Sequence, residues 1–512
     1  MLTQLRQQLA KNNLSSIVGA ARIKTKPPNI VIKTDCVQSY EKALSVLNSV
    51  IDKERYTLHH VVSKNFLQGS WKGSCSLLLY NVVDELCEQS KPLIQSYVQD
   101  CDGKVIIYSD NTESNTSLQD IKEFTNDINK QYPHQMVMFE ECIDSIKKYD
   151  LVFVLKLMGM SCTEETQPPS GEHLLTNAYL LSSKKVEDIF ALNDEGSVKG
   201  KDITLKFSPQ NGSHKTTNDE FVVITNTSKN DIKSSFDVEF YQSKLKTVKY
   251  GQDIIVTEVI NSTHTIFTGV NVNSIQSDGL VVHARRQLKG KGRTGNQWLS
   301  PLGCMMFSMQ FDIPMNSPLG RSLSMIQHLV IVAFVKSIKE RGDGYKDLAL
   351  GIKWPNDIYI DGKIKIGGII VNTCLWQNDF KVTVGLGVNI SNDKPTDCLN
   401  SLIRHYNQTK GAQLKELVIE DVLAATLNEI ENLVYVFQNE GAQRFKDEYY
   451  QYWLHSGRKV TLESYNMRQA EVVGIDDYGY LVVKILQNGE IVTLQPDGNS
   501  FDMMKNMIKI KS

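Results

Sequence analysis

The stretch LKGKGRTGNQW, residues 288–298, combines the residue types that bind anions. Gly290, Gly292 and Gly295 follow the spacing G-x-G-x-x-G. Residues 279–311 contain no Asp or Glu but five Lys and Arg side chains, so this segment is positively charged. Glycines let a backbone approach a ligand closely, and cationic side chains neutralise a negative one. An anionic ligand is therefore predicted at this loop.

Three familiar kinds of loop share parts of this pattern. A dinucleotide loop must open a helix whose N-terminus holds the pyrophosphate, whereas the following QWLSPLGCMMFSMQF, with Pro301, favours an extended segment. A kinase loop requires V-A-I-K, H-R-D and D-F-G downstream, and the sequence lacks these motifs. Binding of nucleic acid is disfavoured because only Trp298 places an aromatic ring among the charges.

A ligase that brings a carboxylate against the α-phosphate of ATP needs the residue types of this loop. Two anions about 4 Å apart repel by roughly 4 kcal/mol at the effective dielectric of a protein site, so neighbouring cations must offset the repulsion. A loop that closes over the ligands would also keep water from a reactive acyl-adenylate. The loop is expected to serve this chemistry.

A second candidate stretch is GIKWPNDIYIDGKIKIGGIIVN, residues 351–372. It predicts a strand, a turn and then a hairpin with Asp361-Gly362 at its tip. Lys365 should point away from the strand face that carries its apolar neighbours. A solvated edge lysine is one interpretation. A ligand contact is the other, because Gly367-Gly368 lets a ligand approach the backbone.

The strand VTVGLGVNIS, residues 382–391, completes a set of motifs. Gly385 and Gly387 share one strand face, which leaves room for a flat ligand. The basic glycine loop, K-W-P-N-D, K-x-G-G and G-x-G-x-N together resemble the motifs of biotin–protein ligases. The tail GIDDYGYLVVKILQNGEIVTLQPDGNSFDMM is similar to the small C-terminal domain of the eukaryotic members, the holocarboxylase synthetases. The resemblance covers about residues 236–510.

The resemblance implies the roles of individual residues. The S-T-N segment of the family corresponds to Ser262, Thr263 and His264, so that His replaces Asn. Lys365 and Arg293 are the implied catalytic charges. The implied biotin contacts are Ser262, Thr263, His264, Gln287, Lys291, Gly292, Arg293, Lys365, Gly385, Gly387 and Val388. The implied ATP contacts are Trp298, Lys353, Asn356, Asp357 and Asn389, with Asp357 as the Mg²⁺ ligand.

The implied reaction has two steps and uses ATP, Mg²⁺ and biotin. The carboxylate of biotin attacks the α-phosphorus of ATP, which gives biotinyl-5'-adenylate and pyrophosphate. A lysine of a biotin-dependent carboxylase then attacks the adenylate and AMP leaves. No DNA partner is implied, because a compact helix-turn-helix is not seen before residue 236. The alternatives are a lipoate-type ligase, whose R-R-x-x-G-G-G signature is missing, and a catalytically silent scaffold with the same fold.

The elements that must position these residues indicate an α/β (α+β) protein. The resemblance implies a mixed sheet similar to class II aminoacyl-tRNA synthetases, followed by an SH3-like barrel. Residues 150–157 predict a buried strand, and residues 117–132 and 322–342 predict helices. The expected units are 1–34, a transit segment or unstructured N-terminus; 35–205, an α/β domain with a regulatory role as one option; 206–235, a linker; 236–453, the catalytic domain; and 454–512, the barrel.

Composition limits the classes of protein that fit the whole chain. Lys and Arg number 56 against 58 Asp and Glu, so the chain has no overall electrostatic footprint for nucleic acid or an anionic membrane. The 9 cysteines form no C-x-x-C pair, which favours a reducing compartment. No apolar run approaches the roughly 20 residues of a membrane span. We expect a soluble cytoplasmic protein, and also a mitochondrial one if residues 1–34 act as a transit segment.

Overall fold

The computed structural model describes residues 29–510 with short gaps. The gaps are residues 53–54, 70, 73–74, 83–88, 110–114, 133–134, 140–141, 163–174, 211–214, 226–231, 233, 294–295, 393–394, 498 and 503–505. The predicted transit segment therefore lies almost wholly outside the described residues, and so does Gly295 of the glycine motif.

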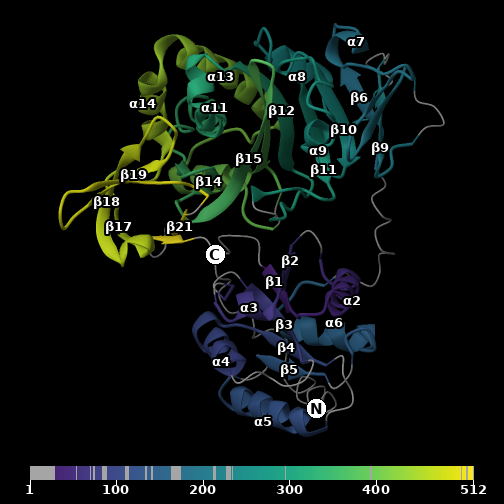
Figure 1. Cartoon of the computed structure of the whole chain (residues 1–512), viewed down its shortest axis with the longest axis vertical. Coiled ribbons are helices and arrows are strands. Elements are labelled where there is room, and N and C mark those ends of the chain that lie inside the picture. The colour runs from purple at the N-terminus through teal and green to yellow at the C-terminus, as the bar shows by residue number, and fades with distance from the viewer. Residues whose placement is uncertain are drawn as a thin grey trace.

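Residues 29–162 form a separate α/β unit in the lower part of Figure 1. Its strands are short apolar runs that pair in parallel in the order β2-β1-β3-β4-β5, as expected for a sheet covered on both faces. One core cluster includes residues of α2 and α6, and another includes residues of α3, α4 and α5. The elements are β1 Asn29–Lys33, α2 Val37–Asn48, β2 Thr57–Val61, α3 Ser63–Phe66, β3 Cys75–Asn81, α4 Ser90–Cys101, β4 Val105–Tyr108, α5 Asn115–Gln131, β5 Met136–Met138 and α6 Lys148–Leu157.

The prediction of a strand at residues 150–157 is wrong, because this segment lies in helix α6. Leu151, Val154 and Leu155 are buried at helical spacing, whereas Lys156 is exposed. A short apolar run does not distinguish a buried strand from a buried helix. The helix predicted at residues 117–132 is confirmed as α5.

The large sheet has eleven strands in the order β13-β14-β15-β16-β12-β11-β10-β6-β9-β8-β7. It is mixed, because β10 pairs with β11 in parallel and β12 pairs with β16 antiparallel. Its strands are β6 Ala178–Leu181, β7 Ser197–Lys199, β8 Thr204–Ser208, β9 Glu220–Ile224, β10 Ile254–Ile260, β11 Val281–Gln287, β12 Cys304–Pro314, β13 Leu350–Lys353, β14 Asp357–Ile360, β15 Ile364–Trp376 and β16 Asp379–Asn389.

Helices α8, α11 and α13 lie together beside this sheet in the upper part of Figure 1. The helix predicted at residues 322–342 is confirmed as α11, which ends just before Gly342 and is preceded by two short turns. The helical elements of this part are α7 Val186–Ile189, α8 Val238–Lys244, α9 Thr265–Thr268, α10 Pro318–Arg321, η4 Leu323–Met325, α11 Ile326–Lys339, α12 Leu399–Lys410, α13 Ile419–Glu440 and α14 Ala442–Tyr452.

The predicted boundary at residue 205 and the linker at 206–235 differ from the observed sheet. Strand β8 crosses residue 205, and β9 lies inside the expected linker. Strands β6 to β9 extend the sheet that also contains β10 and β11, and they share a core cluster with those strands. The polar residues that suggested a linker lie on either side of short strands. These strands are too short to show a clear alternation of apolar and polar residues.

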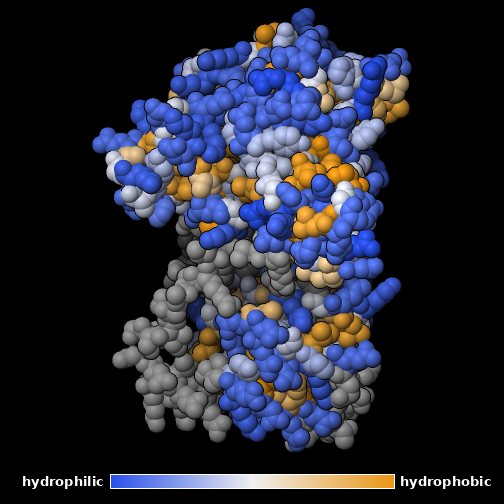
Figure 2. Space-filling model, turned by 90° about the vertical axis from the view of Figure 1, so that its left-hand side faces the viewer, coloured by the Kyte–Doolittle hydropathy of each residue, from blue (hydrophilic) through white to orange (hydrophobic). Residues whose placement is uncertain are grey.

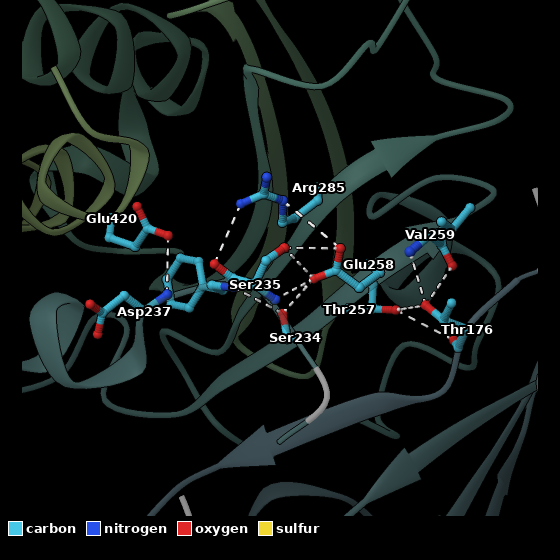
Figure 3. Close-up of polar contacts among 10 residues, drawn as sticks. Thr176, Ser234, Ser235, Asp237, Thr257, Glu258, Val259, Arg285 and Glu420 are labelled. Atoms are coloured by element: carbon cyan, nitrogen blue, oxygen red, sulfur yellow. Dashed lines mark hydrogen bonds and ion pairs between the residues drawn. The ribbon is translucent and has the colours of Figure 1, made fainter. Parts of the chain in front are cut away.

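The end of the expected linker is also fixed to the sheet. Figure 3 shows Glu258, on β10, with its carboxylate facing two serines. Oε1 of Glu258 accepts hydrogen bonds from Oγ of Ser234 at 2.9 Å and from the backbone N–H of Ser235 at 2.7 Å. The backbone N–H of Asp237 donates to Oε1 of Glu420, at 3.1 Å. These bonds anchor the segment that leads into α8.

The C-terminal residues form the predicted small β domain, drawn in yellow in Figure 1. Its six strands follow the order β20-β19-β18-β17-β22-β21. Gly479 lies in the turn between β18 and β19 and has a φ of 74° there. The elements are β17 Lys459–Leu462, η5 Glu463–Tyr465, β18 Arg468–Ile475, β19 Leu481–Ile485, β20 Ile491–Leu494, β21 Asn499–Asp502 and β22 Met507–Ile510.

The surface drawn in Figure 2 is mainly hydrophilic, with hydrophobic residues in separate patches. Within the described part of the chain, every helix is too short or too polar to cross a membrane.

Candidate functional site

One cavity of about 260 Å³ lies between the large sheet, the glycine-rich loop and the C-terminal domain. Its walls come from the turn after β10, from β11, β12, β15 and β16, and from the turn between β13 and β14. The predicted site residues that line it are Ser262, Thr263, His264, Gln287, Lys291, Gly292, Arg293, Trp298, Lys353, Asn356, Asp357, Lys365, Gly385 and Gly387. Motifs far apart in the sequence thus converge on one cavity.

Two predicted contacts, Val388 and Asn389, are not part of the described lining. Side chains alternate along β16, so Gly385 and Gly387 face the cavity while Val388 is buried in the core on the opposite face. Nδ2 of Asn389 donates to Oγ1 of Thr396 at 3.0 Å, beyond the end of the strand. The assignments of Val388 to biotin and of Asn389 to the nucleotide stay predictions.

One end of the cavity carries neutral polar groups. Oε1 of Gln287 accepts hydrogen bonds from the backbone N–H of Thr263 at 2.8 Å and from its hydroxyl at 3.1 Å. The Thr263 hydroxyl also lies 2.9 Å from the hydroxyl of Ser308, and Ser262 is buried beside it. These side chains hold fixed hydrogen-bonding groups without a net charge, which suits a neutral polar ligand.

His264 stands at this neutral end, and its two ring nitrogens have different surroundings. Nε2 lies 2.6 Å from Oδ1 of Asn372, so Nε2–H is the donor of that bond. Burial lowers the pKa of His264, which keeps the ring neutral and leaves Nδ1 as an acceptor. A Cβ atom at Gly385 would lie 3.1 Å from Nδ1, so glycine keeps the space beside this acceptor open.

The described residues on the two sides of the glycine-rich loop pair with each other in antiparallel fashion. The backbone N–H of Gly292 donates to the carbonyl of Asn296 at 2.7 Å, and that of Trp298 donates to the carbonyl of Gly290 at 2.9 Å. A Cβ atom at Gly290 would lie 2.3 Å from the carbonyl oxygen of Trp298. Glycine is required there by the close approach of two backbone segments.

Trp298 fills the space beside Gly387 on β16. A Cβ atom at Gly387 would lie 2.5 Å from Nε1 of the indole. On its other side the indole faces Lys365, whose Nζ lies 5.9 Å from the ring centroid. The room expected above Gly387 therefore holds a protein side chain, and Trp298 forms part of the cavity wall.

Arg293 connects the glycine-rich loop to two other parts of the protein. Its Nη1 donates to Oδ1 of Asn356 at 3.0 Å, and its Nη2 donates to Oδ1 of Asp497 at 2.8 Å. The first partner belongs to the turn before β14, and the second to the C-terminal domain. One guanidinium thus links three segments around the cavity.

Lys365 forms an ion pair at the cavity wall. Its neighbours Ile364 and Ile366 are buried, whereas its own side chain lies on the other face of β15, as predicted. Nζ of Lys365 is 2.6 Å from Oδ1 of Asp357. Among the described lining residues Asp357 is the only carboxylate, and the cations are Lys291, Arg293, Lys353 and Lys365. This excess of positive charge suits a ligand with several negative charges.

The turn between β13 and β14 is held rigidly. Nδ2 of Asn356 donates to the carbonyl of Ile369 at 2.6 Å, and the backbone N–H of Ile369 donates back to the carbonyl of Asn356 at 3.1 Å. Nζ of Lys353 is buried 5.2 Å from the ring centroid of Tyr359. The K-W-P-N-D segment therefore presents its polar groups from a fixed backbone.

Several site residues were not predicted from the sequence. Asn499 and Phe501 of β21 line the cavity, Asp497 binds Arg293, and Asn372 binds His264. The only sequence signal for the first three was the turn-forming stretch PDGNSFD within the tail. Their roles depend on how the C-terminal domain packs against the large sheet.

The residues at the site provide few ligands for a metal ion. Among the described residues, no group of three His, Cys, Asp or Glu side chains could hold one. Asp357 alone offers a carboxylate at the cavity, and Lys365 is bound to it. Such a site fits Mg²⁺ only as an ion held mainly by phosphate oxygens, with one protein carboxylate nearby.

Comparison with known proteins gives matches along the same segments. Residues 256–389 match the biotin/lipoate A/B protein ligase family, and residues 455–505 match the biotin protein ligase C-terminal domain. The chain is 35% identical to the biotin–protein ligase of Homo sapiens, with 71% of this chain and 50% of that protein covered. For the biotin–protein ligase of Schizosaccharomyces pombe, identity is 32% and the coverage is 71% and 64%. The chain thus spans between half and two thirds of these two relatives.

A plant relative is covered more fully. Biotin–protein ligase 2 of Arabidopsis thaliana is 34% identical, with 54% of this chain and 83% of that protein covered. Among solved structures, the biotin protein ligase from Aquifex aeolicus in complex with biotin and ATP has a TM-score of 0.35 at 24% identity, covering 47% of this chain and 98% of that one. The resemblance seen in the sequence is confirmed by the two family matches and by the plant relative: the chain belongs to the biotin–protein ligase family.

Proposed function

We propose that this protein is an ATP-dependent biotin–protein ligase. The observation that carries the proposal is the division of one cavity into a neutral polar end at Thr263 and Gln287 and a cationic end at Lys365 and Arg293. Biotin has the same division, with a neutral ureido ring at one end and a carboxylate at the other. ATP brings further negative charge to the cationic end.

The neutral end is assigned to the biotin ring. Ser262, Thr263 and Gln287 provide hydroxyl and amide groups for the ureido oxygen and N–H groups. His264 takes the place of Asn in the family's S-T-N segment, and its Nδ1 is positioned to accept a hydrogen bond from a ureido N–H. Gly385 provides the opening next to that nitrogen.

The cationic end is assigned to the meeting of the two substrates. The biotin carboxylate attacks the α-phosphorus of ATP, a P–O bond forms, and pyrophosphate leaves with the electrons of the broken P–O bond. Lys365 and Arg293 stabilise the negative charge that concentrates there, because preorganised cations stabilise a charged transition state strongly. Lys291 and Gly292, in the loop, cover the resulting adenylate and exclude water.

The nucleotide is assigned to the side formed by Lys353, Asn356, Asp357 and Trp298. Lys353 offers a positive charge for the phosphates, and Trp298 offers an aromatic surface for adenine. Asp357 would be the protein carboxylate beside a Mg²⁺ ion bound with ATP, and that ion would neutralise charge on the polyphosphate.

The product of the second step defines the partner. The ε-amine of an acceptor lysine attacks the acyl carbon of biotinyl-5'-adenylate, an amide bond forms, and AMP leaves. The acceptor is the biotin carrier domain of a biotin-dependent carboxylase. We assign the reaction to the cytoplasm, and to mitochondria as well if residues 1–34 direct import.

The test is biotin-dependent exchange of pyrophosphate into ATP. Lys365→Ala should lower the exchange rate by about 100-fold or more, because it removes a charge from the site of attack. Lys363→Ala is the matched control, since this lysine is exposed in the same hairpin. Exchange supported by lipoate and not by biotin, or full exchange by Lys365→Ala, would contradict the proposal.

A further inference from the structure

His455 lies at the junction between the catalytic sheet and the C-terminal domain. It follows α14 and precedes β17, and its ring is fully buried. The ring centroid lies 5.5 Å from that of Trp453 and 4.3 Å from that of Phe501. Because Phe501 lines the cavity, His455 packs directly behind a cavity wall.

The ring of His455 also holds the backbone of the K-W-P-N-D turn. Its Nε2 accepts a hydrogen bond from the backbone N–H of Trp354 at 2.8 Å. The indole N–H of Trp354 donates to the carbonyl of Gly479 at 2.9 Å. Both N–H groups of this buried tryptophan therefore end on the C-terminal domain, two residues before Asn356.

The imidazole of His455 lowers the stability of the fold at this position. Burial lowers the pKa of His455 to about 3, so the ring is neutral near pH 7 and Nε2 can accept a hydrogen bond. The other ring nitrogen, Nδ1, is buried and has no hydrogen-bond partner within the described part of the protein. A buried polar atom without a partner destabilises a fold, but an apolar ring here would leave the N–H of Trp354 without its acceptor.

We propose that His455 is a positioning residue for the nucleotide side of the site: through Trp354 it holds the turn that presents Asn356 and Asp357 to the cavity. This inference rests on the proposed adenylation reaction. The residues assigned to the biotin ring lie in the turn after β10, on β11 and on β16, which are other elements than this turn. His455 should therefore affect the use of ATP and leave the binding of biotin unchanged.

Three substitutions separate the hydrogen bond from the packing. His455→Phe keeps an aromatic ring and removes the acceptor. His455→Gln returns an acceptor near the position of Nε2, whereas the shorter side chain of His455→Asn does not reach it. In the pyrophosphate-exchange assay the KM for ATP should rise about tenfold in the Phe and Asn variants and by less than about threefold in the Gln variant. The KM for biotin should stay within about twofold of the wild-type value.

Hydrogen–deuterium exchange gives a readout that does not depend on turnover. In peptides that cover residues 350–360, the amide of Trp354 should exchange about tenfold faster in His455→Phe and His455→Asn than in the wild type, with recovery in His455→Gln. If the Phe variant does not fold, the exchange rates of the Trp354 amide in His455→Gln and His455→Asn still test whether the hydrogen bond holds the turn.

The proposal is overturned if the KM values for both substrates rise together, if kcat alone falls, or if Trp354 exchanges at the wild-type rate in the folded Phe or Asn variant. A wild-type protein without biotin-dependent exchange would instead refute the proposed function, and the amide measurement would still decide whether His455 holds the turn.

Discussion

Lys365 and Arg293 both form ion pairs at the site, but their carboxylate partners differ in solvent exposure. The pair Lys365–Asp357 has side-chain exposures of 24% and 16%, whereas the pair Arg293–Asp497 has 23% and 89%. Water and salt screen the second pair far more than the first, and exposed pairs contribute little stability. Asp497 therefore binds the glycine-rich loop weakly, and breaking its ion pair with Arg293 requires little free energy.

Asp497→Asn should speed the release of biotinyl-5'-adenylate by about two- to fivefold at low salt, because an exposed ion pair is worth about 1 kcal/mol or less. The rate of pyrophosphate exchange should change by less than about twofold. The measurement is the dissociation rate of the preformed adenylate, and the difference from the wild type should shrink at about 1 M salt, where the Debye length is about 3 Å.

Glu490→Gln is the control for this measurement. Glu490 is an exposed acid of the same domain whose side chain binds Asn488 and not the loop. An adenylate release rate that is equal in wild type and Asp497→Asn at low salt would show that Asp497 does not hold the loop.

At the scale of elements, the site depends on the fit between strand β16 and the glycine-rich loop. The indole of Trp298 lies so close to Gly387 that a methyl group there must displace it. The backbone of β16 is extended, so alanine causes no conformational strain and acts only through this contact. The fit of one side chain against one glycine thus sets the shape of the cavity wall.

Gly387→Ala should lower kcat/KM for biotin-dependent exchange by about 10- to 100-fold, because overpacking typically costs about 1–3 kcal/mol. Gly385→Ala is the comparison, since its added methyl would lie 3.1 Å from Nδ1 of His264, in the space assigned to the biotin ring, and would not meet the indole.

A double-mutant cycle identifies the contact responsible. In a Trp298→Ala background, Gly387→Ala should have a much smaller effect, because the clashing group is gone. Equal effects of Gly387→Ala with and without the indole would show that its cost has another source.

Across the whole molecule, the large sheet begins earlier in the chain than the sequence motifs suggest. Strand β6 pairs with β10, and β10 leads directly to Ser262 and Thr263. Strands β6 to β9 bury Ile255, Ile260 and Val282 in a shared core cluster. The strands at residues 178–224 therefore support the strand that carries the predicted biotin contacts.

Truncation tests this arrangement. A chain that begins at residue 175 should keep all eleven strands and unfold cooperatively, with pyrophosphate exchange within about threefold of the full-length rate. A chain that begins at residue 236 exposes the apolar face and edge of β10, so its Tm should fall by more than about 10 °C. The measurements are calorimetry and the exchange assay, and equal Tm values for the two truncated chains would contradict the role given to β6 to β9.

The local structure of several site segments was predictable from the amino-acid sequence. The glycine-rich loop, the hairpin turn at Asp361-Gly362 and the alternation around Lys365 depend on interactions between residues close in sequence, so their local structure was predictable. The same period of two places Val388 on the face opposite Gly387, so its position in the core could also have been predicted.

Only the tertiary structure decided which distant segments complete the site. The helix at residues 150–157, the membership of β6 to β9 in the large sheet, and the contacts of Asp497 and His455 with the cavity residues all depend on partners far away in the chain. A short apolar or polar segment is compatible with several partners. The choice among them is made by the total apolar surface buried and the hydrogen bonds satisfied, and these are properties of the assembled fold.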